Sequence, residues 1–332
     1  MRLPGATGAS QPENRQTIDR FWESGRIDDT RSQRRQRVEE GGRRIIIEEP
    51  DDRVIIREGD QVIIRHDETD RFRRAYRDAD IREERRGTEN ITIVRRLDGS
   101  EIVTVRDEYG NLIRRVRREP AGREVVLIEN RRGGTGVRGG YGYVEEEVLR
   151  LPPPVVRIPR EEYIVEAERA TEEDYVRAFT APPVERVERA YTLDEIRQSQ
   201  PLRERMRRVD LNTINFEFGS WQLPPDQAGT LSGIAQALQQ AISRNPNEVY
   251  LVEGHTDAVG TDEDNLALSD RRAETVATIL TQRFQVPAEN LTTQGYGEQY
   301  LKVNTQDPER ENRRVTIRRI TPLLQGQNQT QQ

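Results

Sequence analysis

The sequence predicts an α+β protein in which a C-terminal α/β sandwich follows an antiparallel β-meander and a helical, proline-rich linker. Short β-branched runs separated by turn residues recur over residues 43–131. Strand and helix patterns alternate over residues 209–320. Only 33% of the 332 residues are hydrophobic and 34% are charged. A typical domain is roughly 45–50% apolar and about 25% charged, so one large, well-filled core is excluded.

The N-terminal residues 1–42 are expected to form a disordered polar segment. Phe21 and Trp22 stand out as bulky apolar residues in a stretch that is otherwise rich in charge, Gly and Pro. A short helix near residues 17–23 is the one element expected there.

Residues 43–131 are expected to form an antiparallel β-meander domain. Their β-branched runs begin at residues 45, 53, 61, 91, 102, 112 and 125. Turn pairs such as Asp98-Gly99 and Gly110-Asn111 separate the runs, as in a series of hairpins. Each run holds only three or four apolar residues, so the core of this sheet is expected to be thin.

Residues 132–208 are expected to act as a linker. The stretch begins with a Gly-rich break at 133–144 and continues with a Pro-rich extended spacer at 151–159. Helical pieces follow, one of them marked by the capping-box spacing of Thr192 and Glu195. We find no pattern here that indicates chemistry, so the segment is expected only to connect.

Residues 209–320 predict one mixed sheet with helices packed on it, in the order βαβαβ-β. Strands are expected at 213–218, 248–254, 291–296 and 315–320. One helix is expected after Pro224, with apolar positions spaced as on one buried face and a stop at Asn245-Pro246. A second helix is expected over 265–284. The last residues, 321–332, are expected to be a disordered polar tail.

The second predicted helix carries one arginine on its cleft side and another on the opposite side. At about 100° per residue, Asn265 and Arg272 fall on one flank beside the buried stripe, whereas Arg271 is expected to point into water. The preceding strand ends at Thr256 and Asp257, which come close to that flank. A carboxylate and a guanidinium facing one cleft suit a zwitterionic ligand.

At these residues the sequence resembles the OmpA-like C-terminal domain. The block EGHTDAVGTDEDNLALSDRRAETV at 253–276 is similar to the family signature, and FEFGS at 216–220, GYGEQYL at 295–301 and ENRRVTI at 311–317 match further blocks in order. This resemblance implies non-covalent binding of peptidoglycan at the diaminopimelate of the stem peptide. The residues that it assigns to the pocket are Asp257, Arg272, Asn265, Thr256 and Arg313. Gly219 stands where many relatives carry Asp, which puts a contact from that strand in doubt.

Composition excludes several classes of function. Residues 209–320 contain 16 acidic and 10 basic side chains, and residues 1–208 contain 43 of each. No large basic field exists to hold a nucleic acid, so none is expected as a partner. Cysteine is absent and histidine occurs only at 66 and 255, so no metal or other cofactor is expected. No run reaches the about 18 apolar residues of a membrane-spanning helix.

The same residues also permit other interpretations. Asp257 and Arg272 would also be compatible with a structural ion pair. His255 and Ser269 suggest a hydrolase triad, but Ser269 lies in the first turns of a helix rather than on a strained turn, so an enzyme is not expected. The acids at 262–264 lack the alternating spacing of a calcium loop and suit a helix N-terminus.

The resemblance implies a non-catalytic protein that attaches an outer-membrane or envelope structure to the cell wall. Its expected location is the periplasm or the periplasmic side of the outer membrane. No signal peptide is visible at the start of the chain, so a partner docked on residues 43–208 or an upstream segment would supply anchoring. The alternative is a scaffold acting through the β-meander, with the wall-binding domain only localising it. An open edge strand on the meander would favour that alternative.

Overall fold

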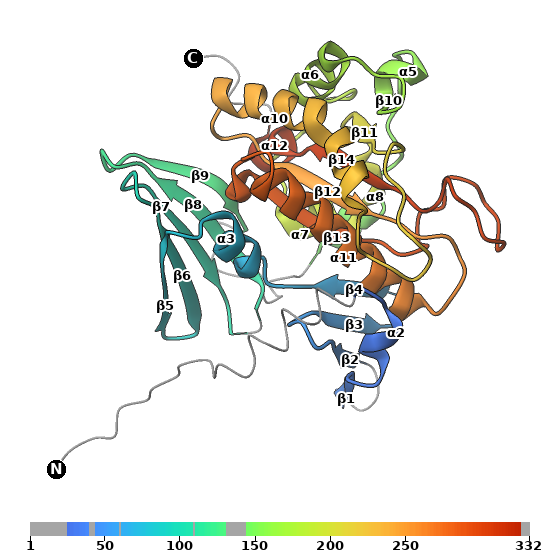
Figure 1. Ribbon diagram of the computed structural model, residues 1–332, viewed down its shortest axis with the longest axis horizontal. Helices are drawn as coiled ribbons and strands as arrows, with labels where there is room; N and C mark the ends of the chain where they lie inside the picture. Colours follow the sequence, from blue (N-terminus) through green and yellow to red (C-terminus); the bar gives the residue numbers. More distant parts are fainter. Residues whose placement is uncertain (1–24, 40–43, 60, 109, 131–143, 327–332) are drawn as a thin grey trace.

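The computed structural model describes residues 25–39, 44–59, 61–108, 110–130 and 144–326. Within these residues the strands form three sheets (Figure 1). The first contains β1 (Arg35–Glu39), β2 (Arg44–Glu48), β3 (Val54–Glu58) and β4 (Gln61–Arg65) in chain order. The second contains β5 (Asp80–Arg86), β6 (Glu89–Arg95), β7 (Glu101–Arg106), β8 (Leu112–Arg118) and β9 (Glu124–Glu129) in chain order.

The third sheet mixes parallel and antiparallel pairs. Its order is β10 (Ile164–Glu166), β11 (Arg208–Asp210), β14 (Val315–Arg319), β12 (Tyr250–Gly254) and β13 (Leu291–Gly295). The outer pairs β10–β11 and β12–β13 are parallel, and β14 runs antiparallel to both of its neighbours. The mixed sheet predicted for the C-terminal region is therefore confirmed.

Most of the helices lie in the C-terminal half of the chain. They are α2 (Asp28–Arg31), α3 (Thr69–Ala75), α4 (Glu146–Leu149), α5 (Arg160–Tyr163), α6 (Glu172–Thr180), α7 (Leu193–Gln198), α8 (Gln200–Arg203), α9 (Pro225–Ala228), α10 (Ser232–Arg244), α11 (Asp262–Gln282) and α12 (Thr321–Gln325). Two short 3₁₀ turns, η2 (Gly229–Leu231) and η3 (Ala288–Asn290), complete the set.

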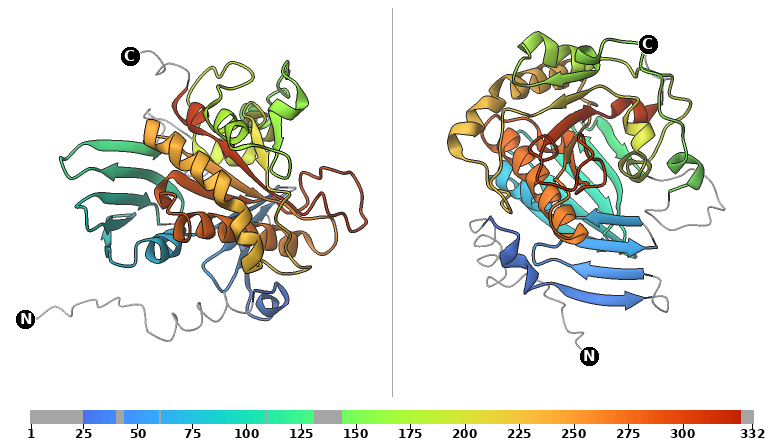
Figure 2. Two further views of the ribbon diagram at one scale, coloured as in Figure 1. Left: turned by 45° about the horizontal axis from the view of Figure 1, so that its top comes forward. Right: turned by 90° about the vertical axis from the view of Figure 1, so that its right-hand side faces the viewer.

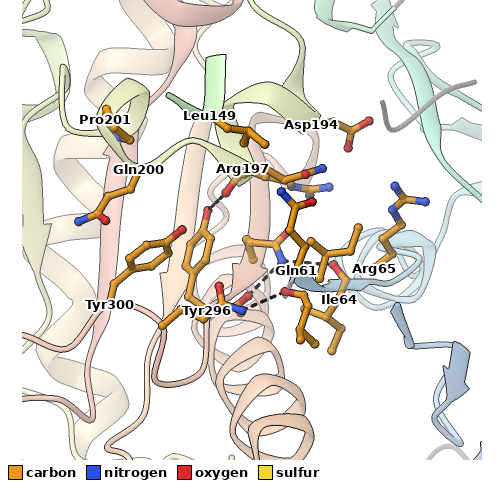
Figure 3. A pocket seen from close by; sticks show the side chains of 16 residues that line it. Gln61, Ile64, Arg65, Leu149, Asp194, Arg197, Gln200, Pro201, Tyr296 and Tyr300 are labelled. Carbon is orange, nitrogen blue, oxygen red and sulfur yellow. Dashed lines mark hydrogen bonds between the residues drawn. The ribbon is translucent and has the colours of Figure 1, made fainter. Parts of the chain in front are cut away.

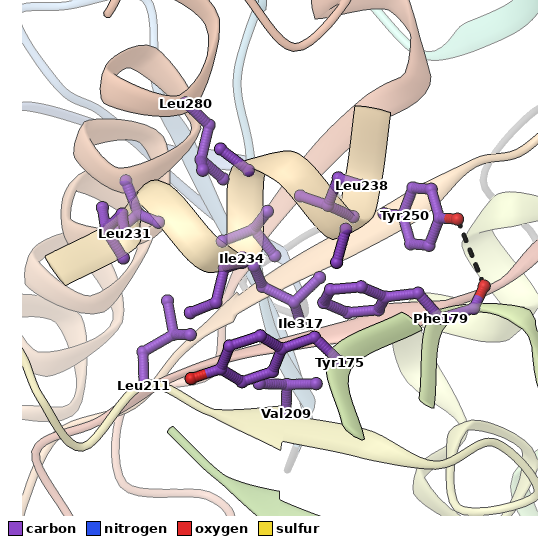
Figure 4. Packing of buried hydrophobic residues seen from close by; sticks show 14 of the residues in the cluster. Tyr175, Phe179, Val209, Leu211, Leu231, Ile234, Leu238, Tyr250, Leu280 and Ile317 are labelled. Atoms are coloured by element: carbon purple, nitrogen blue, oxygen red, sulfur yellow. Dashed lines mark hydrogen bonds between the residues drawn. The ribbon is translucent and has the colours of Figure 1, made fainter. Parts of the chain in front are cut away.

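Both faces of the third sheet are covered by apolar side chains. On one face α6, α10 and α11 pack around Tyr250 and Ile317, and Tyr175 and Phe179 of α6 enter the same cluster (Figure 4). On the other face α4, α7, α8 and α12 pack together with strand β9 of the second sheet. The two further views show these layers from other sides (Figure 2).

The segment expected to be a linker is, in its described part, a component of this core. Strand β10 adds an edge to the third sheet, and α6 packs on α10. Thr171 caps α6 through a reciprocal capping box with Asp174, which fixes the start of the helix. The expectation that residues 132–208 only connect is thus wrong for residues 144–208. The Gly-rich break at 133–143 lies outside the described residues.

The predicted opening strand at 213–218 is also wrong. Residues 213–218 lie outside the strands, and β11 at 208–210 takes the place beside β14 instead. The alternation of Ile214 and Phe216 indicated a strand, but the carbonyl of Glu217 accepts a hydrogen bond from a side chain, that of Arg272, at 3.0 Å. Phe218, the third apolar residue of that pattern, is exposed.

The antiparallel strands predicted over residues 43–131 are confirmed, but they divide into two sheets rather than one meander. Helix α3 separates the sheets, and the Asp67 carboxylate accepts from Thr69 N at its start, at 2.7 Å. Phe72 of α3 packs with Val94 and Ile102 of the second sheet. The alternation of apolar residues stops between β4 and β5, so this stretch forms a helix rather than a strand of either sheet.

The two ends of the described chain are ordered where polar disorder was expected. Within 1–42, residues 25–39 include α2 and β1, and Ile27 is buried against Trp221. Within 321–332, α12 buries Leu323 on the third sheet. The helix expected near 17–23 lies outside the described residues.

Helix α11 runs between the third sheet and the N-terminal part of the chain, and 15 of its 21 residues are buried. Two glycines let it approach the sheet closely. A Cβ on Gly254 would stand 1.9 Å from the carbonyl oxygen of Ser269, and one on Gly295 would stand 2.4 Å from the amide nitrogen of Asp270. On its other side, α11 contacts α3 and β4.

Candidate functional site

The predicted site residues lie where β12 and α11 meet. β12 ends at Gly254, and the next residues are held by backbone hydrogen bonds: His255 N donates to Arg314 O, and Thr256 N donates to Gly297 O, both at 2.9 Å. Helix α11 begins at Asp262, where Thr261 accepts from Asp264 N at 3.2 Å as its cap. The loop between them therefore leaves the sheet at the end of a strand and enters the N-terminus of a helix.

Asp257 is a buried carboxylate that pairs with Arg313. Its Oδ2 accepts from Arg313 Nη1 at 2.6 Å, and its Oδ1 accepts weakly from Val259 N at 3.4 Å. Asp257 is 2% exposed, whereas 27% of the Arg313 side chain is exposed. Arg313 is therefore the part of this pair that meets solvent.

Arg272 lies beside the same pair and is 1% exposed. Its Nε donates to Ser220 O at 2.9 Å and its Nη2 to Glu217 O at 3.0 Å, and the guanidinium stands 5.1 Å from the Phe216 ring centroid. Burial and, less strongly, the positive charge of Arg313 lower the pKa of Arg272, the Asp257 carboxylate opposes them, and the resulting pKa is about 9.

Thr256 and Asn265 complete the set of predicted residues. Asn265 Nδ2 donates to Glu298 Oε2 at 2.5 Å. Both residues lie next to Gly297. Thr256 N donates to the Gly297 carbonyl, and a Cβ added at Gly297 would lie 3.2 Å from the carbonyl carbon of Asn265. Two buried polar atoms of the site, Thr256 Oγ1 and Arg272 Nη1, have no hydrogen-bond partner among the described residues.

The structure therefore brings Asp257, Arg272 and Arg313 together and places Thr256 and Asn265 next to them. Sequence reasoning missed Glu298 as the partner of Asn265, although it lies within the block at 295–301 that carries the resemblance. It also missed the backbone carbonyls that hold Arg272. They belong to Glu217 and Ser220, on either side of Gly219, whose φ is +68°.

Arg271 does not point into water as the helical wheel predicted; it is fully buried. Its Nη2 donates to Glu49 Oε2 at 2.9 Å and to Asp51 Oδ1 at 3.0 Å. The guanidinium also lies 4.9 Å from the Trp221 ring centroid. The prediction was wrong because the side of α11 opposite the cleft is covered by the turn between β2 and β3, which the pattern of the helix cannot show.

His255 and Ser269 have separate partners. Burial lowers the pKa of His255 to about 3, the charge of Arg314 acts in the same direction, and the Glu253 carboxylate opposes both. The imidazole stacks on Tyr296 with ring centroids 5.6 Å apart. Ser269 Oγ donates to Leu266 O and accepts from Gly297 N, each at 2.8 Å. These contacts give both residues structural roles.

Across the described residues, none of the helices combines the length and apolarity that a bilayer crossing demands. The OmpA family model matches residues 215–314. The probable lipoprotein YiaD of Escherichia coli is 34% identical over 114 residues, which are 34% of this chain and 49% of that protein. The peptidoglycan-associated lipoprotein of Pseudomonas putida is 36% identical over 111 residues, 33% of this chain and 63% of that protein.

One solved structure, the peptidoglycan-associated lipoprotein from Burkholderia pseudomallei, is 28% identical with a TM-score of 0.29 and covers 32% of this chain and 87% of that chain. For the two lipoproteins of Escherichia coli and Pseudomonas putida, the matched part of the present chain spans less than two thirds of the length of the relative. Residues 215–314 form a domain of the OmpA family.

Proposed function

We propose that the OmpA-family domain binds peptidoglycan without covalent chemistry and so holds an envelope structure to the cell wall on the periplasmic side of the outer membrane. The names of its relatives support this, because they include peptidoglycan-associated lipoproteins and an outer membrane porin. The recognised group would be the diaminopimelate of the stem peptide, whose side chain ends in an ammonium and a carboxylate on one carbon.

The geometry supports one orientation of that group. The Asp257 carboxylate would face the ammonium, and Arg272 would donate to the carboxylate. Thr256, Asn265 and Arg313 would line the same pocket. The binding would be passive, with no step in which a bond forms or breaks.

The observation that carries the proposal is the pair of unsatisfied atoms, Arg272 Nη1 and Thr256 Oγ1. A buried polar atom without a partner costs about 1–3 kcal/mol. A ligand group that accepts from either atom would remove the cost for that atom on binding. The two other donor nitrogens of Arg272 are already held by backbone carbonyls, so the guanidinium is fixed in place before a ligand arrives.

A second role, that of a scaffold acting through residues 43–131, is favoured by one observation. β4 is an edge strand of the first sheet, and part of its backbone faces a cavity. Such an edge is a place where another chain can add.

Calorimetric titration of the full chain with soluble muropeptides tests the proposed ligand. A muropeptide with diaminopimelate at the third position is expected to bind. One with lysine there keeps the ammonium but lacks the carboxylate, so it should bind at least about tenfold more weakly. Equal affinities would contradict the role given to Arg272.

A further inference from the structure

A cavity of about 540 Å³, whose described lining includes none of the proposed wall-binding residues, lies between β4, the α7–α8 pair and the end of β13 (Figure 3). Cavities that hold ligands commonly measure about 300–1,000 Å³ and often lie where two parts of a fold meet. Arg65, Asp194 and Arg197 lie at one end of this cavity, and Gln200 and Tyr300 lie at the other (Figure 3).

One wall of the cavity is the edge of a sheet. Within the described part of the chain, β4 pairs with β3 and with no other strand. On the other side, the carbonyl of Val62 accepts from the Gln299 side chain at 2.9 Å, and the carbonyl of Ile64 accepts from the Gln294 side chain at 3.2 Å. In an antiparallel strand the N–H and C=O of one residue point to the same side. The N–H groups of Val62 and Ile64 therefore also face the cavity.

The charged end of the cavity has an excess of cations. Arg197 donates from Nη2 to Thr292 Oγ1 at 2.6 Å and to Thr293 O at 3.0 Å, while its buried Nε has no partner among the described residues. Burial lowers the pKa of Arg65; the carboxylates of Asp194 and Asp107 oppose this shift, and the positive charges of Arg44 and Arg197 act in the same direction as burial. Among the described residues that line the cavity, Asp194 is the only acid and faces two arginines, so this end is suited to receive a carboxylate.

We propose that this cavity receives an extended peptide that adds to β4 as a further strand and places an acidic side chain between Arg65 and Arg197. Its carbonyls would accept from the Val62 and Ile64 N–H groups, which lie about 7 Å apart at the spacing of alternate strand residues. Main-chain hydrogen bonds of this kind support strand addition in many peptide-binding proteins.

The two glutamines distinguish this ligand from a sugar. Gln294 and Gln299 occupy the strand carbonyls that an added strand would need, so they compete with a peptide and protect the edge when it is empty. A saccharide would instead use the same side-chain amides as direct partners. Removing Gln299 is therefore expected to strengthen peptide binding and to weaken sugar binding.

Proline at residue 62 removes the outward N–H without removing a bond to β3, and edge strands tolerate it at such a position. Alanine at residue 62 is the matched control, because it shortens the side chain and keeps the N–H. The probe is a fluorescein-labelled peptide, acetyl-Val-Thr-Val-Thr-Asp, measured by fluorescence polarisation with the full chain. A second peptide with Asn in place of Asp tests the carboxylate.

The wild-type chain and Val62→Ala are expected to bind the acidic peptide with a dissociation constant below about 1 mM. Val62→Pro should bind about tenfold more weakly, the Asn peptide should also bind about tenfold more weakly, and Gln299→Ala should bind severalfold more tightly. In the wild-type chain, exchange of the Val62 and Ile64 amide hydrogens should slow when the peptide is added. That measurement serves also if Val62→Pro does not fold.

Absence of binding up to about 1 mM, equal affinities of Val62→Pro and Val62→Ala, or unprotected amides at 62 and 64 in the complex would overturn the proposal. Binding of chitotriose that is weakened by Gln299→Ala would replace the peptide by a sugar. Asp257 does not line this cavity, so Asp257→Ala is expected to leave peptide affinity unchanged. Loss of wall binding and loss of peptide binding can therefore be told apart.

Discussion

Arg271 of α11 donates to Glu49 at 2.9 Å, and neither side chain has any solvent exposure. The next residue, Arg272, is held by carbonyls of a different segment and lies beside Asp257. One turn of α11 thus joins the N-terminal sheet to the proposed binding site. The N-terminal sheet and the domain that contains α11 are therefore packed against each other, although they are separate segments of the sequence.

Arg271→Ala is expected to lower the free energy of unfolding by on the order of 3 kcal/mol, because it leaves the buried carboxylate of Glu49 with fewer partners. Arg283→Ala is the matched control, since Arg283 lies just after the same helix and is exposed. Urea unfolding of both variants provides the measurement. Similar midpoints and slopes for the two variants would show that the Arg271 contact contributes little.

The pH dependence of the free energy of unfolding should show that a protonated His66 stabilises the fold. Burial opposes its charge, but Asp270, 2.9 Å from its Nδ1, and Glu274 outweigh burial and raise the pKa of His66 to about 9. Because this pKa exceeds the unfolded value of about 6.5, the contribution of protonated His66 to the free energy of unfolding is complete below about pH 6.5. It is lost as pH rises through about 9, and amounts to on the order of 3 kcal/mol.

Unfolding free energies of His66→Gln measured between pH 6.5 and 9 should therefore fall less steeply than those of the wild type. His255→Gln is the control. The folded pKa of His255, about 3, lies below the unfolded value of about 6.5, so its contribution is complete above about pH 6.5 and is lost as the pH falls from there toward 3. An unchanged slope in His66→Gln would argue against a charged imidazole at neutral pH.

Gly254→Ala is expected to be poorly tolerated, because its Cβ would lie 1.9 Å from the backbone carbonyl oxygen of Ser269. Relief requires α11 to move away from β12, at a cost of about 3 kcal/mol. At Gly229 the same change meets open space, and in this helical turn it should be neutral or stabilise by up to about 1 kcal/mol. Thermal unfolding of both variants decides, and equal melting temperatures would contradict the close approach.

The elements with a strong local signal were predictable from the sequence. α10 has an apolar stripe and a stop at Asn245-Pro246, and α11 has apolar residues at helical spacing. β10 could not be found, because three residues are too few to show alternation. The segment 213–218 does alternate, but a loop held by Arg272 satisfies its backbone, and a local pattern carries no information about such a partner.

Some contacts of the site were likewise predictable and others were not. The helical periodicity of α11 predicted that Arg272 lies near the end of β12, because the two positions are joined by one loop between one strand and one helix. The burial of Arg271 was not predictable, since its partner Glu49 is 222 residues away in sequence. Nor was Glu298 identified, because its contact with Asn265 depends on the turn at Gly297.

Co-sedimentation of the full chain with purified peptidoglycan sacculi tests the proposed site most directly. The wild-type chain and the control Asp262→Ala, an exposed acid in the first turn of α11, are expected to pellet with the sacculi. Asp257→Ala and Arg272→Ala, shown to be folded by circular dichroism, should remain in the supernatant. Each change removes one partner of a buried charged contact, which costs on the order of 2–5 kcal/mol. Pelleting of both folded variants to the wild-type extent would contradict peptidoglycan binding at Asp257 and Arg272.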